Sequence, residues 1–192
     1  MTELEEYITS YFGITAGEIS KISSFFQLTT LKKGDYFLKA GHVCDKLSFH
    51  RSGIIRVFAG VEHREITQWI STKSYFLTDL SGIMFNQPAK YSMQALTDCE
   101  LYTISRKDYT TIGKLIPSWH ELEKLFIARC FTLMEERIFA LLSMPAEERY
   151  ALLFSQRREL FNEVPLQYLA SMMGMTPETL SRIRKKGTLK TN

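Results

Sequence analysis

The sequence predicts an α+β protein in which a run of short strands is framed by helices. Between residues 29 and 104, short β-favouring runs alternate with turn residues roughly every ten positions, as in a sandwich or barrel. Residues 119–143 contain no helix breaker, and residues 164–186 have the spacing of two short helices around a glycine turn. A hydrophobic content of 45% and an aromatic content of 12% are typical of a globular chain.

Two helices are predicted at the start of the chain. The first covers residues 3–12. The second begins at Thr15, because Thr15-x-x-Glu18 fits a capping box, in which the two side chains satisfy backbone N–H groups at the helix start. Apolar residues at helical spacing predict that this second helix packs on a core: Ile19, Ile22, Phe25 and Phe26.

Six short runs are then predicted to be strands, at residues 36–38, 47–50, 54–59, 65–70, 90–96 and 101–104. Turn residues lie between them, at 33–35, 40–42, 52–53 and 60–62. In the fifth run Tyr91, Met93 and Ala95 alternate with Ser92 and Gln94, so one face of that strand is expected to be buried.

The helices after the strands have recognisable start signals, Ser105-x-x-Asp108 and Ser118-x-x-Glu121. A helix over residues 119–143 would be about 38 Å long at 1.5 Å per residue. Its apolar residues lie on more than one side. One side can cover the strand domain and another a second copy of the chain, which predicts a dimer. The alternative is a helix buried twice within one chain.

Residues 164–186 predict a helix-turn-helix, VPLQYLASMMGMTPETLSRIRKK. Pro145 ends the long helix, a further helix covers 146–155, and residues 161–165 lead into this segment. The first helix buries Leu166, Leu169, Ala170 and Met173, and Gly174 ends it, because glycine enters the left-handed conformation without steric cost. Thr176 caps the second helix, Pro177 takes its first position, and Leu180 and Ile183 face inward. The remaining polar residues are free to enter a DNA major groove.

The charge distribution supports a polyanion-binding end. The net charge is +3. Residues 162–192 hold five basic and two acidic side chains, whereas the other 161 residues hold 19 of each. The whole positive excess therefore lies in the last part of the chain, as in a nucleic-acid-binding module attached to a neutral body. A solvated basic tail is the alternative.

Other functional classes lack their residues. Cys44, Cys99 and Cys130 give no disulfide framework, zinc spacing or four-cysteine iron–sulfur set. The four histidines are scattered without an HxH pair, and no GxSxG, P-loop or GxGxxG motif occurs, so neither an enzyme nor a metal site is expected. A haem held by His and Cys stays open. No signal peptide and no apolar run of ~20 residues is present, which predicts a cytoplasmic protein without a membrane span.

Several blocks in order resemble the Crp/Fnr family of transcription regulators: residues 31–58, 64–70, 94–109, 145–154 and 164–186. The resemblance implies an N-terminal cyclic-nucleotide-binding-like β-roll or jelly roll over 1–116, a dimerisation helix over 117–143 and a DNA-binding domain over 144–192. It also implies a homodimer on a palindromic site in double-stranded DNA, with RNA polymerase as a candidate partner.

The resemblance places the family's phosphate cassette at residues 75–91. Thr78 and Asp79 stand where the family has Gly-Glu. Ala89 and Lys90, followed by Tyr91, stand where it has Arg followed by Ser or Thr, so the guanidinium that binds the cyclic phosphate is missing. Leu122 and Glu123 occupy the base-contacting positions and offer no hydroxyl. We therefore expect weak or no binding of cyclic AMP; another small effector, or none, stays open.

The resemblance also places Glu178 and Arg182 at base-reading positions, with Pro177 at a position that is often Arg. The expected DNA-binding residues are Thr176, Glu178, Thr179, Ser181, Arg182, Arg184, Lys185 and Lys186. Pairing of Arg182 with Glu178 is the structural alternative. Only six residues follow Lys186, fewer than a hairpin wing needs, so no full wing is expected. A sensor or interaction protein that has lost DNA binding is the competing interpretation.

Overall fold

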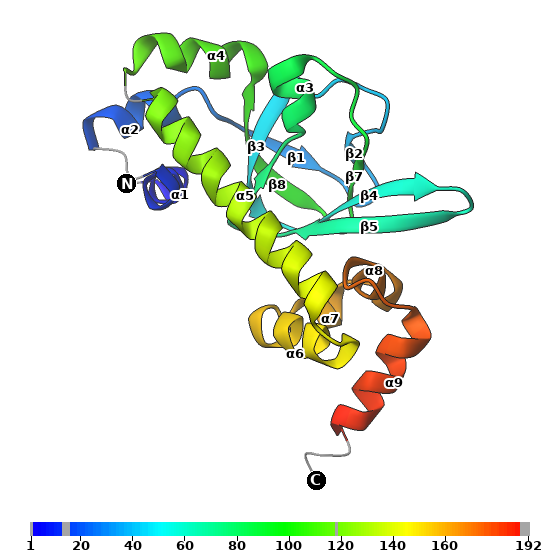
Figure 1. Cartoon of the computed structure of the whole chain (residues 1–192). Coiled ribbons are helices and arrows are strands. Elements are labelled where there is room, and N and C mark those ends of the chain that lie inside the picture. Colours follow the sequence, from blue (N-terminus) through cyan, green and yellow to red (C-terminus); the bar gives the residue numbers. More distant parts are fainter. Residues whose placement is uncertain (1, 13–15, 118, 189–192) are drawn as a thin grey trace. The chain divides into compact units, whose positions relative to one another are not determined.

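The computed structural model describes residues 2–12, 16–117 and 119–188. The chain divides into two compact units. The first consists of Met1–Val57 and Ile70–Phe131, and the second of Phe58–Trp69 and Thr132–Asn192. The predicted α+β class is confirmed, since helices precede, interrupt and follow two four-stranded sheets (Figure 1).

The first part of the chain contains α1 (Glu3–Phe12), α2 (Ala16–Ser23), β1 (Gln27–Leu31), β2 (Tyr36–Leu38), β3 (Lys46–Ser52), β4 (Ile55–Val61), β5 (Arg64–Ser71), β6 (Phe76–Leu77), α3 (Leu80–Phe85), β7 (Ser92–Ala95) and β8 (Cys99–Ser105). The helices α4 (Arg106–Leu115), α5 (Trp119–Ser143), α6 (Ala146–Gln156), α7 (Leu160–Glu163), α8 (Leu166–Met172) and α9 (Pro177–Thr188) follow.

The strands form two sheets with the orders β1-β8-β3-β6 and β2-β7-β4-β5. β8 pairs antiparallel with both β1 and β3, and β2 pairs antiparallel with β7. The six predicted strand runs correspond to β2, β3, β4, β5, β7 and β8. β1 and β6 were not predicted. β1 is an almost wholly exposed edge strand and β6 has two residues, so neither produces a hydrophobic alternation.

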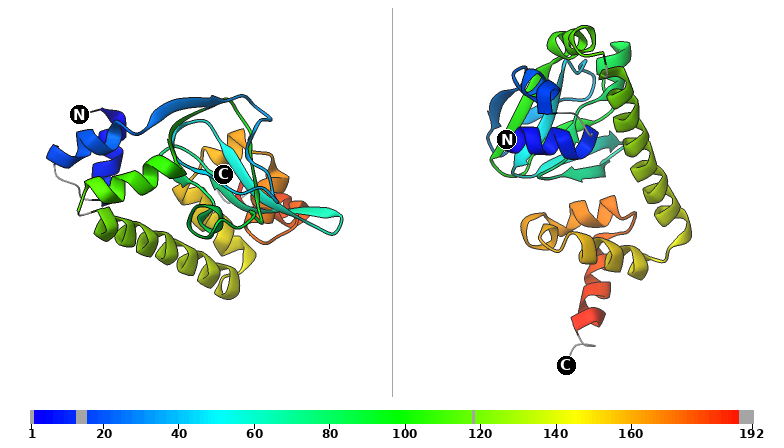
Figure 2. Two further views of the ribbon diagram at one scale, coloured as in Figure 1. Left: turned by 90° about the horizontal axis from the view of Figure 1, so that it is seen from above. Right: turned by 90° about the vertical axis from the view of Figure 1, so that its left-hand side faces the viewer.

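Helices cover one face of the first sheet (Figure 2). Phe49 of β3 and Ile104 of β8 are fully buried in a cluster with Ile22 of α2 and Ile112 of α4. The start of α5 adds Trp119, Leu122 and Phe126 to this cluster. Full burial of such side chains stabilises the fold by about 1.5–3 kcal/mol each. Packing of the second helix is thus confirmed, whereas Thr15, its predicted cap, lies outside the described residues.

Three of the predicted turns contain a glycine with positive φ: Gly34, Gly41 and Gly53. At Gly53 a Cβ atom would lie 2.4 Å from the carbonyl oxygen of Asp98, so no larger residue fits. The turn expected at 60–62 is shifted. Gly60 lies within β4, and Glu62, with φ of 54°, adopts the left-handed conformation instead, because the hairpin closes over residues 62–63.

The start signal of α4 is confirmed. The Ser105 hydroxyl oxygen accepts a hydrogen bond from the Asp108 N–H at 3.1 Å, and the hydroxyl donates to the Asp108 carboxylate at 2.7 Å. α5 has the predicted bounds, Trp119–Ser143, although Ser118, its expected cap, lies outside the described residues.

In the second unit, the two short helices and the glycine turn lie where the sequence predicts. Leu169 and Ala170 of α8 and Leu180 of α9 are completely buried. Gly174, with φ of 65°, follows the end of α8. Residues 189–192 are outside the described part of the chain, so the expected lack of a wing stays a prediction.

Candidate nucleic-acid surface and effector pocket

Helix α9 begins at a defined cap. The Thr179 N–H donates to the Thr176 Oγ at 3.2 Å, and Pro177 occupies the first helical position, where no N–H is needed. The turn before it is closed by the Met175 N–H, which donates to the Ala170 carbonyl oxygen at 3.0 Å. Leu180 and Ile183 then bury one side of α9. This packing leaves the opposite side of the helix in solvent.

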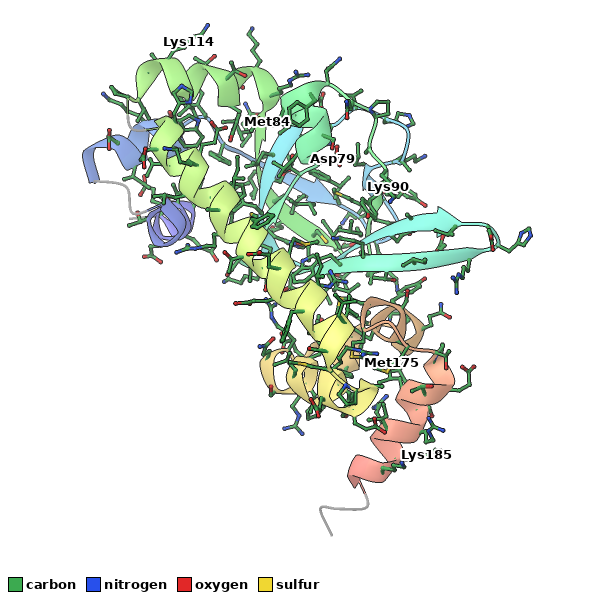
Figure 3. The ribbon with its side chains drawn as sticks, viewed as in Figure 1. Asp79, Met84, Lys90, Lys114, Met175 and Lys185 are labelled. Carbon is green, nitrogen blue, oxygen red and sulfur yellow. The ribbon has the colours of Figure 1, made fainter. Side chains whose placement is uncertain are left out.

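The structure gathers all eight predicted DNA-binding residues on α9 and its cap. Thr179 and Arg184 are half-buried, and the other six are exposed: Thr176, Glu178, Ser181, Arg182, Lys185 and Lys186. Figure 3 shows Lys185 near the end of α9 and Met175 in the preceding turn. No ion pair joins Glu178 to Arg182, both of which the structure describes, so the guanidinium is not held by that carboxylate.

Charge is distributed along α9 in the order that a helix dipole favours. The pKa of Glu178 is lowered by a hydrogen bond from its own backbone N–H and by the Thr176 hydroxyl. Lys185 and Lys186 lie in the last turn. The exposed surface is therefore negative at its start and positive at its end.

Arg149 of α6 supports the turn before α9, a role with no sequence signal. Its Nε donates to the Met173 carbonyl at 2.8 Å, and its Nη2 lies 3.4 Å from the Gly174 carbonyl. Its Nη1 donates to the Met144 carbonyl at 2.5 Å, after the end of α5. One guanidinium thus fixes two backbone segments. Its partners are backbone oxygens up to 25 residues away, which no side-chain pattern reveals.

The residues expected at the effector pocket fall into three groups. In the first, Asp79 caps α3: its carboxylate accepts a hydrogen bond from the Gly82 N–H at 2.7 Å. The Thr78 hydroxyl donates to the Lys46 carbonyl at 3.0 Å. Gly82 packs closely on the backbone of Cys44, since a Cβ atom there would lie 2.6 Å from the Cys44 nitrogen. Thr78 and Asp79 therefore both serve the local fold.

The second group follows α3. Ala89 is buried and exchanges backbone hydrogen bonds with Gly41 and His42, at 2.8 and 2.9 Å. Lys90 is exposed, and its Nζ lies 5.6 Å from the centroid of the half-buried Tyr91 ring. Figure 3 labels Asp79 and Lys90, which come from different ends of this segment. Lys90 offers a point charge without the planar fork of a guanidinium.

The third group lies on α5 and makes contacts elsewhere in the first unit. Leu122 belongs to the helix-covered core. Glu123 accepts a hydrogen bond from the Tyr109 hydroxyl of α4 and lies 3.5 Å from the Nδ1 of His120. Both residues thus fasten α5 to its surroundings, and no hydrogen bond joins them to the residues around α3.

A cleft of about 280 Å³ lies in the first unit along β2 and residues 42–46, beside the partners of Thr78 and Ala89. None of the predicted effector residues lines it. Among the described residues no three His, Cys, Asp or Glu side chains are grouped to hold a metal ion. His50 is instead structural: it is fully buried, its Nδ1 is 3.0 Å from the Ser71 Oγ, and burial lowers its pKa to about 4. No described helix is long and apolar enough to span a bilayer.

Comparison with known proteins identifies the domain and the fold. Residues 28–114 match the family described as cyclic nucleotide-binding domain. No curated protein matches the sequence. Among solved structures, FixK2 from Bradyrhizobium japonicum has a TM-score of 0.73 at 14% identity, with 86% of each chain covered.

Two further structures extend the likeness over more of the chain. A regulator described as belonging to the Crp/Fnr family, from Eubacterium rectale, has a TM-score of 0.72 at 19% identity and covers 96% of this chain and 88% of its own. The c-di-GMP responsive global regulator CLP of Xanthomonas campestris has a TM-score of 0.67 at 17% identity, covering 92% and 93%. Residues 28–114 thus match a cyclic nucleotide-binding domain, and the fold is that of Crp/Fnr-type regulators.

Proposed function

We propose that this protein is a homodimeric, DNA-binding transcription regulator of the Crp/Fnr type whose effector pocket departs from the cyclic AMP pattern. The observation that carries the proposal is α9: a capped helix, buried on one side by Leu180 and Ile183, that exposes Arg182, Lys185 and Lys186 on the other. It lies in the part of the chain that holds the whole positive excess.

The chemistry of α9 suits reading of a major groove. An arginine such as Arg182 can bind the O6 and N7 of guanine with two hydrogen bonds, and a glutamate such as Glu178 can accept from the N4 of cytosine. Lys185 and Lys186 can neutralise phosphates, which supplies affinity without sequence information. Specificity is therefore assigned to Glu178 and Arg182, and the salt-dependent affinity to the last turn of the helix.

Dimerisation is assigned to α5. Nine large apolar side chains on this helix are exposed: Leu125, Ile127, Phe131, Leu133, Met134, Ile138, Phe139, Leu141 and Leu142. Five of them, from Ile127 to Leu141, recur at alternating spacings of four and three residues, which is the repeat of a two-helix coiled coil. A two-fold dimer would present two copies of α9 to half-sites about 34 Å apart.

Cyclic AMP is not the proposed effector; another small ligand, or none, is the alternative that the pocket leaves open. The Asp79 carboxylate already caps α3, and Ala89 stands at the position of the family's arginine, so the guanidinium is missing. One structural neighbour is described as responsive to c-di-GMP, so the fold by itself does not dictate the ligand. Contact with RNA polymerase and a cytoplasmic location stay predictions.

Selection of duplexes from a random pool, followed by a mobility-shift assay over a salt series, tests the proposal. We expect a palindromic consensus, binding as a dimer, and an affinity for random DNA that falls steeply with salt because counterions are released. A protein that binds no duplex, or binds every duplex alike, would overturn it in favour of an interaction protein. A monomer at micromolar concentration in analytical ultracentrifugation would overturn the dimer.

A further inference from the structure

Residues 58–69 of the β4–β5 hairpin, called the hairpin tip below, belong to the compact unit that contains α9. Residues 58–69 group with residues 132–192, although β4 and β5 are strands of the sheet β2-β7-β4-β5. β5 is an edge strand of that sheet, and edge strands expose backbone N–H groups that need partners. The partners in this unit come from α8 and α5.

The first attachment is a backbone hydrogen bond to α8. The N–H of Thr67 donates to the Ser171 Oγ at 2.9 Å. Thr67 is only 1% exposed, so water cannot readily replace the serine hydroxyl. Loss of the serine hydroxyl would remove this hydrogen bond from a buried N–H group.

The next two residues of β5 are attached to α5. The amide of Gln68 lies 3.9 Å from the sulfur of Met134. The guanidinium of Arg137 lies over the Trp69 ring, 5.2 Å from its centroid, and its Nη2 donates to the Met172 carbonyl of α8 at 3.3 Å. Arg137 thus contacts both the hairpin tip and the end of α8. Three consecutive hairpin residues are held in this way.

We infer that Thr67, Trp69, Arg137 and Ser171 form a clasp through which the hairpin tip positions α8, and with it the recognition helix α9. α8 and α9 pack against each other, and Ala170 of α8 and Leu180 of α9 are both completely buried, so the orientation of α8 sets that of α9. The inference rests on the proposed function. It makes the hairpin tip a positioning element for DNA reading, since a preorganised surface loses less freedom on binding.

Substitution of Ser171 tests the clasp in the whole chain. Ser171→Ala removes the acceptor, whereas Ser171→Thr keeps a hydroxyl. Ser155→Ala is the matched control, because the exposed Ser155 on α6 donates only to the Leu152 carbonyl. We expect amide hydrogen exchange at Thr67 to become about tenfold faster in Ser171→Ala, the size of one net hydrogen bond. Ser171→Thr and Ser155→Ala should keep the wild-type rate.

DNA binding supplies the second measurement. Ser171→Ala should weaken binding to the selected duplex about three- to tenfold and leave binding to random DNA unchanged, because only specific contacts need the helix in one orientation. Arg137→Gln should act in the same direction, because it removes the cation over Trp69. A merely structural defect would weaken both kinds of binding alike.

The outcomes separate the clasp from the proposed function. Unchanged exchange at Thr67 in Ser171→Ala overturns the clasp, whatever the protein binds. Tighter DNA binding by that variant also overturns it, since the hairpin would then restrain α9. Faster exchange together with a wild-type protein that prefers no duplex overturns the proposed function and the positioning role, while the physical attachment stands.

Discussion

Helix α9 of the second unit and the segment around α3 of the first unit both carry polar side chains that the sequence marks as functional. On α9, Arg182 and Lys185 are exposed on a helix whose fold depends on other residues. Around α3, Asp79 and Thr78 are already engaged in helix capping and backbone hydrogen bonds. The side chains of α9 are thus available to a partner, whereas Asp79 and Thr78 already have partners within the fold.

The largest effect that we expect is a loss of stability at acidic pH, caused by the buried His50 of the first unit. The His50 pKa of about 4 lies below its ordinary value of 6.5, because burial disfavours the charged imidazole. Between these values the unfolded chain binds a proton that the folded chain does not. The contribution of the neutral His50 to the free energy of unfolding is therefore complete above about pH 6.5. It falls by about 3 kcal/mol as the pH is lowered toward 4. Urea unfolding as a function of pH measures it.

His50→Gln is the control for this prediction, because glutamine can bond Ser71 but does not titrate in this range. Exposed carboxylates titrate in the same range in both proteins, so the difference between the two pH curves isolates His50. Equal slopes for wild type and variant would contradict the structural role given to this histidine.

Arg182→Ala tests whether α9 reads bases, as we propose. We expect the specific duplex to bind about 1–3 kcal/mol more weakly, with relaxed preference at one base pair, because a bidentate guanine contact is lost. Lys186→Ala, in the same helix, should weaken all duplexes alike and reduce the salt slope by about one. Fluorescence anisotropy over a salt series measures both. Equal loss on specific and random DNA for Arg182→Ala would argue against base reading.

The sequence predicts elements well where side chains alone determine them. The bounds of α5 match because Pro145 and the run of helix formers define them, and α9 matches because Thr176, Pro177 and the apolar pair Leu180 and Ile183 act locally. β1 and β6 were missed because backbone pairing with β8 and β3 creates them. The turn contacts of Arg149 were missed for the same reason, since their partners are distant carbonyl oxygens.

The candidate sites show the same contrast. The residues expected to bind DNA form one surface because they share one helix. The expected effector residues come from three segments. The resemblance to the family's cassette assigns their positions in the sequence, but it does not predict the hydrogen bonds that they make within the fold. The carboxylate of Asp79 illustrates this: its type suits a ribose hydroxyl, yet the Gly82 N–H lies 2.7 Å away and accounts for it.

The smallest expected effect tests that interpretation of Asp79 directly. Asp79→Ala should lower the free energy of unfolding by about 0.5–2 kcal/mol, the usual cost of an N-cap, and Asp79→Asn should restore most of it. Asp45→Ala is a suitable control, because that carboxylate is exposed and caps no helix. Calorimetric titration with cyclic AMP should show weak or no binding to all of these proteins. Low-micromolar binding that Asp79→Ala abolishes would instead place the carboxylate in a working nucleotide pocket, and the difference between the two regions would disappear.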